Sequence, residues 1–563
     1  MEKAFKKLAV ILMASISFYL SGCSQQTPAD LIISGGRFYT MNPAEPRVEA
    51  VAVRGDRIVY AGTAEGANKF RAAETTLLDL KGKTVLPGLI DAHAHLLSLG
   101  RFLVELNLVG TTSPQQIRDM VLKKAAETPQ GGWISGRGWD QNDWEIKKFP
   151  TWRDLAGTES HPVYLRRIDG HAAWVNQTAL KLCGIDRNTP DPIGGKIIRD
   201  QDGEPTGVFI DDAADLIALK MPLPPPDEQI RRLKSAIQKC HSVGLVGVHD
   251  AAIDSTKLDV FEELHRRGEL TLRVNAMLYD SSQTQSWLKS WFERGTLETD
   301  DHYFKIRSVK LFADGALGSR GAALLEPYSD DPSNRGLLLK STDELYQLTK
   351  SALEAGFQVC THALGDLGVR TVLDAYERAL KGASPGDYRL RIEHCEVISP
   401  ADQPRFAALG VIPSMQPTHA TSDMPWIEDR LGPERVKGVC VWRELLDSGC
   451  RIPCGSDFPV ESPDPLWGIY AAVTRQDHEG RPEGGWYPRQ KMTVEEAVRG
   501  FTIDAAYAEF AEDLKGSIEV GKLADFTILD RDIFEIPARE ILDTQVRYTI
   551  VGGNIVYQSP DLE

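Results

Sequence analysis

The chain has 563 residues, of which 42% are hydrophobic, and it carries a formal net charge of −16 at pH 7. This length exceeds one ordinary small domain, and the apolar fraction is ample for a large buried core, which excludes a disordered chain. The acidic balance argues against a nucleic-acid-binding surface, which needs a basic face, so we expect no nucleic-acid partner.

The first 22 residues predict a signal peptide. Three lysines precede an apolar run over residues 8–20, which is too short to span a membrane. Residues 20–23 resemble a bacterial lipobox, which implies cleavage before Cys23 and lipid attachment to its thiol, and Ser24 favours sorting to the outer membrane. We expect an exported lipoprotein of the bacterial cell envelope, tethered at the outer membrane by its lipid anchor only and facing the periplasm. Simple secretion with a chance cysteine is the alternative.

Strand signals alternate with helix-like segments from about residue 85 to residue 457, which is typical of a parallel α/β domain. We predict eight core strands, the number that a (β/α)8 barrel of the TIM type needs, at residues 86–93, 244–249, 272–278, 306–312, 357–362, 390–394, 411–415 and 452–457. About 150 residues separate the first two strands, far more than a crossover requires. We therefore expect an inserted subdomain at about 98–243, with the proline-rich segment 221–226 at its exit.

Two histidines one residue apart, His93 and His95, end the first predicted strand. Residues i and i+2 of an extended strand point to the same face, so both imidazoles can reach one cation. Zinc and related transition ions favour this donor. A coincidental His-Ala-His in a surface loop is the alternative reading of this short motif.

Other predicted strands carry further candidate ligands, which are Lys310, His362, His394 and Asp457. Any one of these histidines could be a core or rim residue, and Lys310 could form a salt bridge at the barrel rim. Their occurrence at the ends of separate strands favours a shared site, because barrels carry their active sites at the carboxyl ends of the strands.

The order of these residues resembles the amidohydrolase superfamily of metal-dependent hydrolases. In that family the first barrel strand supplies His-x-His, the fourth a lysine that is often carboxylated, the fifth and sixth one histidine each, and the eighth an aspartate. The corresponding residues here are His93, His95, Lys310, His362, His394 and Asp457. More narrowly, segments 169–171, 309–320 and 455–460 resemble amidohydrolase family 3, the branch that contains N-substituted formamide deformylase.

The resemblance implies a site for one or two divalent metal ions, with zinc expected and Lys310 carboxylated. It also implies that short strands at both termini form a composite β-sandwich, whereas two unrelated β appendages are the alternative. The expected domains are the signal peptide 1–22, the N-terminal part of the sandwich 23–84, the barrel 85–505 and the C-terminal part 506–563.

The resemblance implies hydrolysis of a nonpeptide C–N bond, in an amide or N-substituted formamide, and the predicted metal site would supply the activated water. Asp457 is the candidate catalytic proton carrier, because a metal contact would orient it beside that water. An unmodified ammonium at Lys310 would be electrostatically costly among metal ions, whereas a carboxylated lysine is an anionic oxygen ligand. The expected partner is a small-molecule amide-type substrate.

Candidate substrate contacts come from the insertion and from the loop after the fourth strand, and they are Trp139, Asp140, Asp169, His171 and Arg320. Packing and capping within the insertion explain its members equally well, with His171 favoured by the resemblance, and Arg320 could contact an anionic substrate. His249 ends the second predicted strand without a ligand counterpart in the family, so we expect a pocket or core residue there.

Two other functions stay open. The same barrel and ligands support ester or phosphoester hydrolysis. A noncatalytic envelope lipoprotein, which binds a ligand or organises a complex, is the nonenzymatic alternative, and the complete ligand set argues against it.

Overall fold

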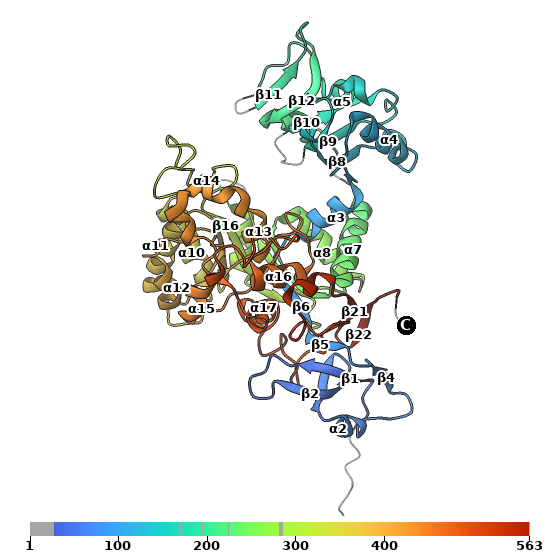
Figure 1. Cartoon of the computed structure of the whole chain (residues 1–563), viewed down its shortest axis with the longest axis vertical. Helices are drawn as coiled ribbons and strands as arrows, with labels where there is room; N and C mark the ends of the chain where they lie inside the picture. The colour runs from blue at the N-terminus through green and yellow to red at the C-terminus, as the bar shows by residue number, and fades with distance from the viewer. Residues whose placement is uncertain (1–26, 168–171, 193–194, 223, 281–284, 562–563) are drawn as a thin grey trace, which may run out of the picture.

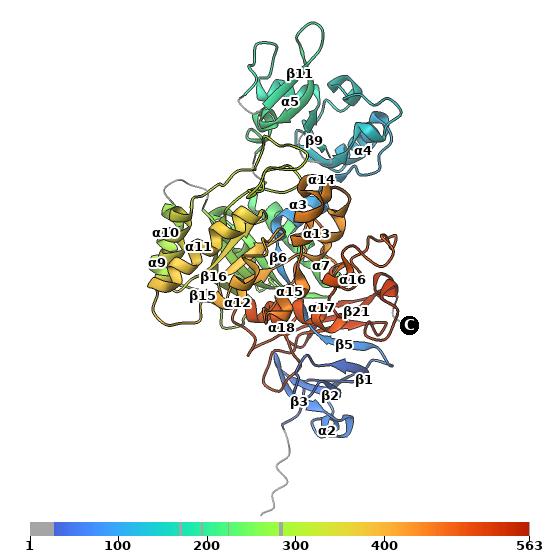
Figure 2. The same cartoon turned by 60° about the vertical axis from the view of Figure 1, so that its left-hand side comes forward.

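The computed structural model describes residues 27–167, 172–192, 195–222, 224–280 and 285–561. Its strands form three sheets, and Figures 1 and 2 show these sheets one after another along the long axis of the molecule. The sheet built from the terminal segments lies at one end, the central sheet with most of the helices follows, and the sheet of the insertion lies at the other end. The central part thus lies between two smaller β-rich parts.

The central sheet is parallel and nearly closed, which gives a barrel-like α/β fold. Its strand order is β19 (Ile412–Ser414), β18 (Arg391–His394), β17 (Gln358–Ala363), β16 (Phe304–Phe312), β14 (Arg273–Leu278), β13 (Leu245–Ile253) and β6 (Leu89–Ala94). The short strand β15 (Leu297–Glu298) pairs antiparallel with β16 outside this order. Seven of the eight predicted barrel strands therefore lie in one sheet.

The eighth predicted strand, residues 452–457, is not a continuous strand. It lies between the two edges of the sheet nevertheless, because Cys454 forms a parallel bridge with Met415 and Phe458 forms one with Ala94. Its backbone departs from strand geometry at Asp457, whose φ is 57°, a left-handed conformation that ends regular pairing. The segment therefore joins both edges of the barrel through single bridges.

The first predicted strand, residues 86–93, divides between two sheets. Residues up to Pro87 belong to β5 (Thr84–Pro87) in the terminal sheet, and β6 begins at Leu89 in the barrel. Pro87 has no N–H to donate to a ladder, and a Cβ at Gly88 would lie 2.4 Å from Val246 Cγ2. The chain changes sheets at this Pro-Gly step, which hydrophobic content alone does not predict.

Helices follow the barrel strands along the chain: α3 (Leu96–Val104), α7 (Pro226–Ser242), α8 (Ser255–Arg266), α9 (Ser286–Arg294), α10 (Thr342–Glu354), α11 (Asp366–Gly382), α12 (Gln403–Leu409), α13 (Pro417–Ser422), α14 (Met424–Arg435), α15 (Trp442–Asp447), α16 (Pro465–Thr474), α17 (Val494–Gly500) and α18 (Ile503–Ala508). Helix α10 starts at a capping box of Ser341 and Glu344, which satisfies two free backbone N–H groups. Helix α11 buries Val369, Val372 and Tyr376, a spacing that places them on one helical face toward the core.

Strands from both ends of the chain share the terminal sheet. Its order is β22 (Asn554–Gln558), β21 (Val546–Val551), β20 (Phe526–Leu529), β5, β1 (Leu31–Tyr39), β2 (Arg47–Arg54) and β3 (Arg57–Gly62), with β4 (Thr76–Asp79) paired to β1. A short helix, α2 (Ala64–Asn68), follows β3. The antiparallel pair of β20 and β5 joins the two ends, while a two-layer sandwich stays a prediction.

A buried ion pair fastens the terminal sheet to the barrel. Asp525, just before β20, accepts hydrogen bonds from Arg273 Nε at 2.8 Å and Nη2 at 2.9 Å. Arg273 begins β14, and both side chains are almost fully buried. Such a two-point pair fixes the relative position of the strands that carry it.

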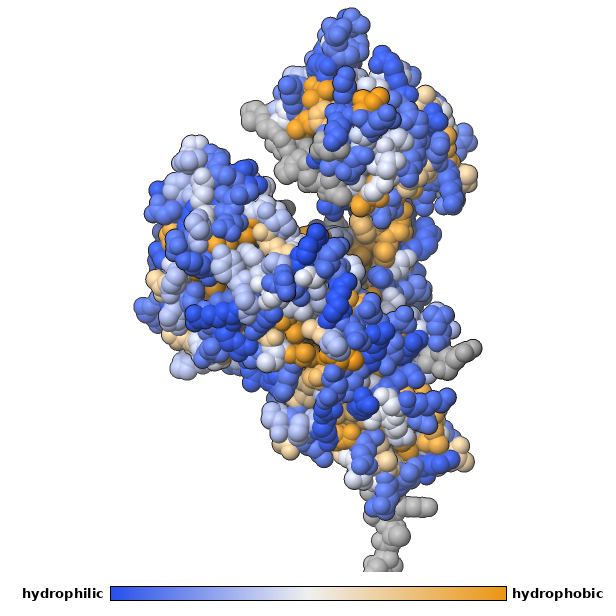
Figure 3. Space-filling view, in the orientation of Figure 1, coloured by the Kyte–Doolittle hydropathy of each residue, from blue (hydrophilic) through white to orange (hydrophobic). Residues whose placement is uncertain are grey.

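The insertion has a sheet of its own. Its strand order is β11 (Gly195–Arg199), β12 (Pro205–Asp211), β10 (Ala172–Val175), β9 (Val163–Arg167), β8 (Ile134–Trp139) and β7 (Leu106–Asn107), accompanied by α4 (Pro114–Ala125), α5 (Gln177–Cys183) and α6 (Asp215–Ala218). Helices α3 and α7 pack against each other where the chain leaves and re-enters the barrel. Figure 3 shows a mainly hydrophilic surface, with apolar colour gathered below the insertion in the region that α3 occupies in Figure 1.

Within the described ranges, no helix combines the length and the apolar character that crossing a membrane requires. Cys23 and the predicted signal peptide lie outside the described residues. The seven described cysteines are free, and six of them are buried.

Candidate metal centre

Three side chains converge at the carboxyl end of the barrel. His93 lies near the end of β6, and His95 follows that strand directly. Asp457 belongs to the segment that bridges the barrel edges. One donor atom from each lies within 4.8 Å of the others, and Asp457 Oδ1 is 3.0 Å from His95 Nε2 and 3.7 Å from His93 Nε2. Two imidazoles and a carboxylate in this arrangement could hold a metal ion.

The other three predicted ligands lie beside this group. Lys310 of β16 places its Nζ 3.2 Å from His93 Nε2. The ring of His394, at the end of β18, lies 4.7 Å from the His93 ring and 4.6 Å from the His362 ring, measured between centroids. The structure therefore brings all six sequence-predicted ligand residues into one cluster.

Burial keeps the imidazoles of His93, His362 and His394 neutral by lowering the pKa of each. Together with the charge of Lys310, it lowers the pKa of His93 to about 4 and that of His362 to about 3. It also lowers the pKa of Lys310 to about 8. At neutral pH these histidines therefore carry lone pairs, which is the form that binds a metal.

Contacts around the cluster orient the rings. His93 Nδ1 is 2.6 Å from a Glu393 carboxylate oxygen, and His394 Nδ1 is 2.8 Å from the Gln416 side-chain oxygen. His95 Nδ1 is 3.0 Å from the carbonyl oxygen of Ala251. Each oxygen accepts a hydrogen bond from Nδ1–H. The Nε2 lone pair of each ring is then available to bind a metal, as is usual around metal-binding histidines.

The His362 imidazole supports the fit of a metal ion to this site. Its Nε2 atom is buried and has no hydrogen-bond partner among the described residues, and the nearest carboxylate oxygen, of Asp314, is 3.8 Å away. A buried polar atom without a partner is costly. A metal ion at the cluster would give this atom a partner.

Two of the predicted ligands have a strained backbone. His394 has a φ of 75° and Asp457 a φ of 57°. Non-glycine residues rarely adopt this left-handed conformation, and those that do gather at functional sites.

Asp91 was not among the sequence-predicted site residues, yet it joins the two chain segments that carry His93 and Asp457. Its carboxylate accepts a hydrogen bond from Ser456 Oγ at 2.6 Å and from the backbone N of His93 at 3.0 Å. Its position two residues before His93 on the same strand is the signal that would have indicated it, whereas Glu393 and Gln416 become apparent only from contacts between strands.

The structure does not place the described candidate substrate residues of the insertion at the metal centre. Trp139 is fully buried, donates its Nε1 hydrogen bond to the carbonyl of Leu165, and packs on Trp144 and Trp174. It is therefore a core residue of the insertion rather than part of a pocket wall. Asp169 and His171 lie outside the described residues.

Two further candidates are engaged in ion pairs. Asp140 accepts a hydrogen bond from Arg167 at 2.6 Å. Arg320 donates two hydrogen bonds to Asp330, at 3.1 and 2.9 Å, so an anionic substrate would have to compete with that carboxylate. His249 is fully buried in the barrel interior.

Comparison with known proteins identifies the family. A model of the amidohydrolase family matches residues 76–557. The chain is 34% identical to the putative amidohydrolase YtcJ of Bacillus subtilis, over 93% of this chain and 98% of that protein. It is 28% identical to N-substituted formamide deformylase of Arthrobacter pascens, over 94% of this chain and 98% of that enzyme.

A solved structure is similar over most of its length. The crystal structure of an uncharacterized metal-dependent hydrolase from Pyrococcus horikoshii OT3 superimposes with a TM-score of 0.77 and 29% sequence identity, covering 90% of this chain and 99% of that one. Because the family match extends over residues 76–557, which is most of the chain, this protein belongs to the amidohydrolase family.

Proposed function

We propose that this chain is a metal-dependent hydrolase that cleaves a nonpeptide C–N bond in a small amide, with N-substituted formamides as the first substrate class. The observation that carries the proposal is the convergence of His93, His95 and Asp457 within 4.8 Å at the carboxyl end of parallel barrel strands. Similarity to N-substituted formamide deformylase, at 28% identity over 94% of this chain, supports the bond class.

We assign six ligands to one or two divalent ions, with zinc as the expected metal: His93, His95, Lys310, His362, His394 and Asp457. The lowered pKa of His93, the Nδ1 contact of His93 with Glu393 and the unpartnered His362 Nε2 support this assignment. When bound, such an ion polarises a carbonyl oxygen and lowers the pKa of water to near 7. Carboxylation of Lys310 would add an anionic oxygen donor at a buried position.

The protein side chains would then move the protons. Asp457 is the proposed proton carrier, which takes a proton from the attacking water and returns it to the departing nitrogen. Its side chain is 12% exposed, whereas that of His93 is 1% exposed, so the Asp457 carboxylate lies closer to the open end of the site. Because His95 carries its proton on Nδ1, its Nε2 and Asp457 Oδ1, which are 3.0 Å apart, both present lone pairs, an arrangement that suits a shared cation.

We further propose the domain layout and the location of the protein. The barrel is taken as a (β/α)8 barrel at 85–505 with an insertion at about 98–243, and segments 23–84 and 506–563 as the two parts of a composite β-sandwich. The shared terminal sheet supports this layout. Lipid attachment at Cys23 and an outer-membrane location rest on the sequence alone.

A substrate panel tests the function. The same zinc-loaded preparation is assayed with N-substituted formamides, N-acyl amino acids, carboxylic esters and phosphoesters. The proposal expects turnover of a formamide or amide that chelator abolishes and zinc restores. Turnover of esters or phosphoesters alone would contradict the bond class, and inactivity toward the whole panel would favour a noncatalytic lipoprotein.

A further inference from the structure

The barrel interior beneath His93 contains a line of buried polar and charged side chains. Glu393 and Arg391 lie two residues apart on β18, and both are fully buried. Arg391 Nε donates to Glu393 Oε1 at 2.8 Å, and its Nη2 donates to Oε2 at 3.1 Å. The carboxylate that contacts His93 is therefore held from its other side by a guanidinium.

This pair fixes the tautomer of His93. Arginine stays protonated in proteins and only donates hydrogen bonds, so Glu393 beside it accepts on both oxygens. His93 Nδ1, 2.6 Å from Glu393 Oε2, must then carry the imidazole proton. Its Nε2 lone pair consequently faces the candidate metal centre.

Arg391 also connects several strands of the barrel. Its Nη2 donates to the carbonyl of Ala92, directly before His93, at 2.8 Å and to Ser414 Oγ of β19 at 2.9 Å. Its Nη1 lies 2.8 Å from His249 Nδ1 on β13. The guanidinium thus fixes the backbone that carries His93 as well as the carboxylate that orients its ring.

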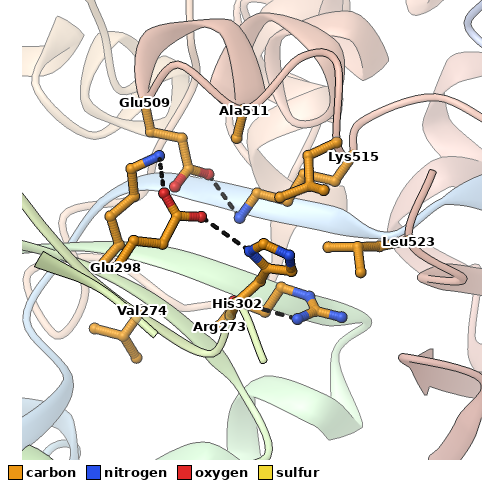
Figure 4. A pocket seen from close by; sticks show the side chains of 10 residues that line it. Arg273, Val274, Glu298, His302, Glu509, Ala511, Lys515 and Leu523 are labelled. Carbon is orange, nitrogen blue, oxygen red and sulfur yellow. Dashed lines mark hydrogen bonds and ion pairs between the residues drawn. The ribbon is translucent and has the colours of Figure 1, made fainter. Parts of the chain in front are cut away.

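The line continues to the opposite end of the barrel. Because Arg391 donates to His249 Nδ1, the neutral ring carries its proton on Nε2, and Glu509 Oε1 lies 3.2 Å from that atom, within ion-pair distance but without hydrogen-bond geometry. Lys515 Nζ is 2.8 Å from the same oxygen. Figure 4 shows Glu509 and Lys515 in a pocket with Arg273 of β14 and Glu298 of β15.

We propose that Arg391 and Glu393 are positioning residues for the metal ligand His93, and that His249 and Glu509 hold Arg391 from the far end of the barrel. The inference rests on the proposed metal site. Glu509, in the segment after α18, would then affect metal affinity although that segment does not contact the metal centre.

The test measures zinc affinity of the full chain by competition with a chromophoric chelator, together with the visible absorption of the cobalt(II)-loaded protein. The main variant combines Arg391→Met with Glu393→Gln, which removes both buried charges and leaves neither unpaired. The new amide can donate as well as accept, so His93 is no longer held in one tautomer. We expect the zinc Kd to rise about 10- to 100-fold and the cobalt spectrum to change.

A second variant, Glu509→Gln, addresses the far end. We expect it to raise the zinc Kd about threefold or more, in the range of coupling through a contiguous network. The matched control is Asp525→Asn, the same carboxylate-to-amide change opposite a buried arginine, Arg273, but without a link to His93. The control should keep the wild-type zinc Kd and cobalt spectrum even if it lowers thermal stability.

A folded double variant with the wild-type zinc Kd and cobalt spectrum would overturn the proposal, as would an equal loss of affinity in Asp525→Asn. If the double variant does not fold, the zinc Kd of Glu509→Gln is the test. An unchanged zinc Kd in that variant would contradict the proposed role of Glu509 in holding Arg391. A wild-type protein that binds no zinc contradicts the metal site itself, and the positioning role with it.

Discussion

Replacing Asp457 by Asn separates proton transfer from folding at the metal centre. Asp457 has a φ of 57°, and Asn is among the residues that tolerate this conformation best. Asn also keeps the size of the side chain and one oxygen beside His95. It cannot accept and return a proton at neutral pH, so we expect the fold and much of the metal to remain.

The expected loss is at least about a hundredfold in the rate of amide hydrolysis, the scale of lost general acid–base catalysis, or about 2.7 kcal/mol in the activation free energy. Single-turnover rates would be measured on the metal-replete variant with zinc content determined in the same sample. Asp464→Asn is the control, since Asp464 caps α16 by accepting from the N–H of Leu466 at 3.0 Å and Asn caps equally well. A wild-type chemical rate for zinc-replete Asp457→Asn would refute the proton-carrier role.

Three further predictions concern metal, anchoring and pH. The double variant His93→Ala with His95→Ala should lose most of the zinc found in wild-type protein by elemental analysis, and full occupancy in the folded variant would exclude both as principal ligands. Cys23→Ala should abolish acyl-lipid labelling and membrane retention while activity persists in the soluble fraction; undiminished labelling would disprove the lipobox. Burial raises the pKa of Asp464 from 3.8 to about 6, so its protonated form stabilises the fold at about pH 4 and that stability is lost as the pH rises through 6. Asp464→Asn should therefore gain Tm relative to wild type between pH 4 and 7, and a Tm difference independent of pH would contradict this.

The ligand cluster could be predicted from the sequence because each member ends or occupies a strand of a parallel barrel. Parallel strands present their carboxyl ends on one face, so His93, His362 and His394 meet although they are far apart along the chain. Strand alternation explains why His93 and His95 reach the same site. No knowledge of side-chain contacts was needed for these positions.

The contacts that orient the ligands could not be predicted in this way. Glu393 meets His93 across 300 residues of chain, and only the near-closure of the barrel brings β6 and β18 together. In the sequence, Arg391 and His249 are polar residues within apolar strands, and their role becomes apparent only from their contact in the barrel interior. The roles of these residues depend on three-dimensional packing, which local patterns do not encode.

Trp139 and residues 452–457 show two other limits. A tryptophan followed by an acidic residue at a strand end can belong to a pocket wall or to a core. The packing of Trp139 on Trp144 and Trp174 shows that it belongs to the core of the insertion. The eighth strand was placed correctly between its neighbours, but the left-handed backbone at Asp457 reduces it to single bridges, and sequence periodicity contains no signal for that strain.

Anomalous X-ray diffraction at the zinc absorption edge, from crystals of the zinc-loaded wild-type protein, tests the metal site most directly. We predict a strong anomalous peak about 2.0–2.1 Å from the Nε2 atoms of His93 and His95, the usual zinc–nitrogen distance, and beside Asp457. A second peak next to Lys310 would indicate two ions. A peak bound elsewhere, or no peak in crystals whose protein retains zinc in solution, would contradict the assignment of this cluster as the metal centre.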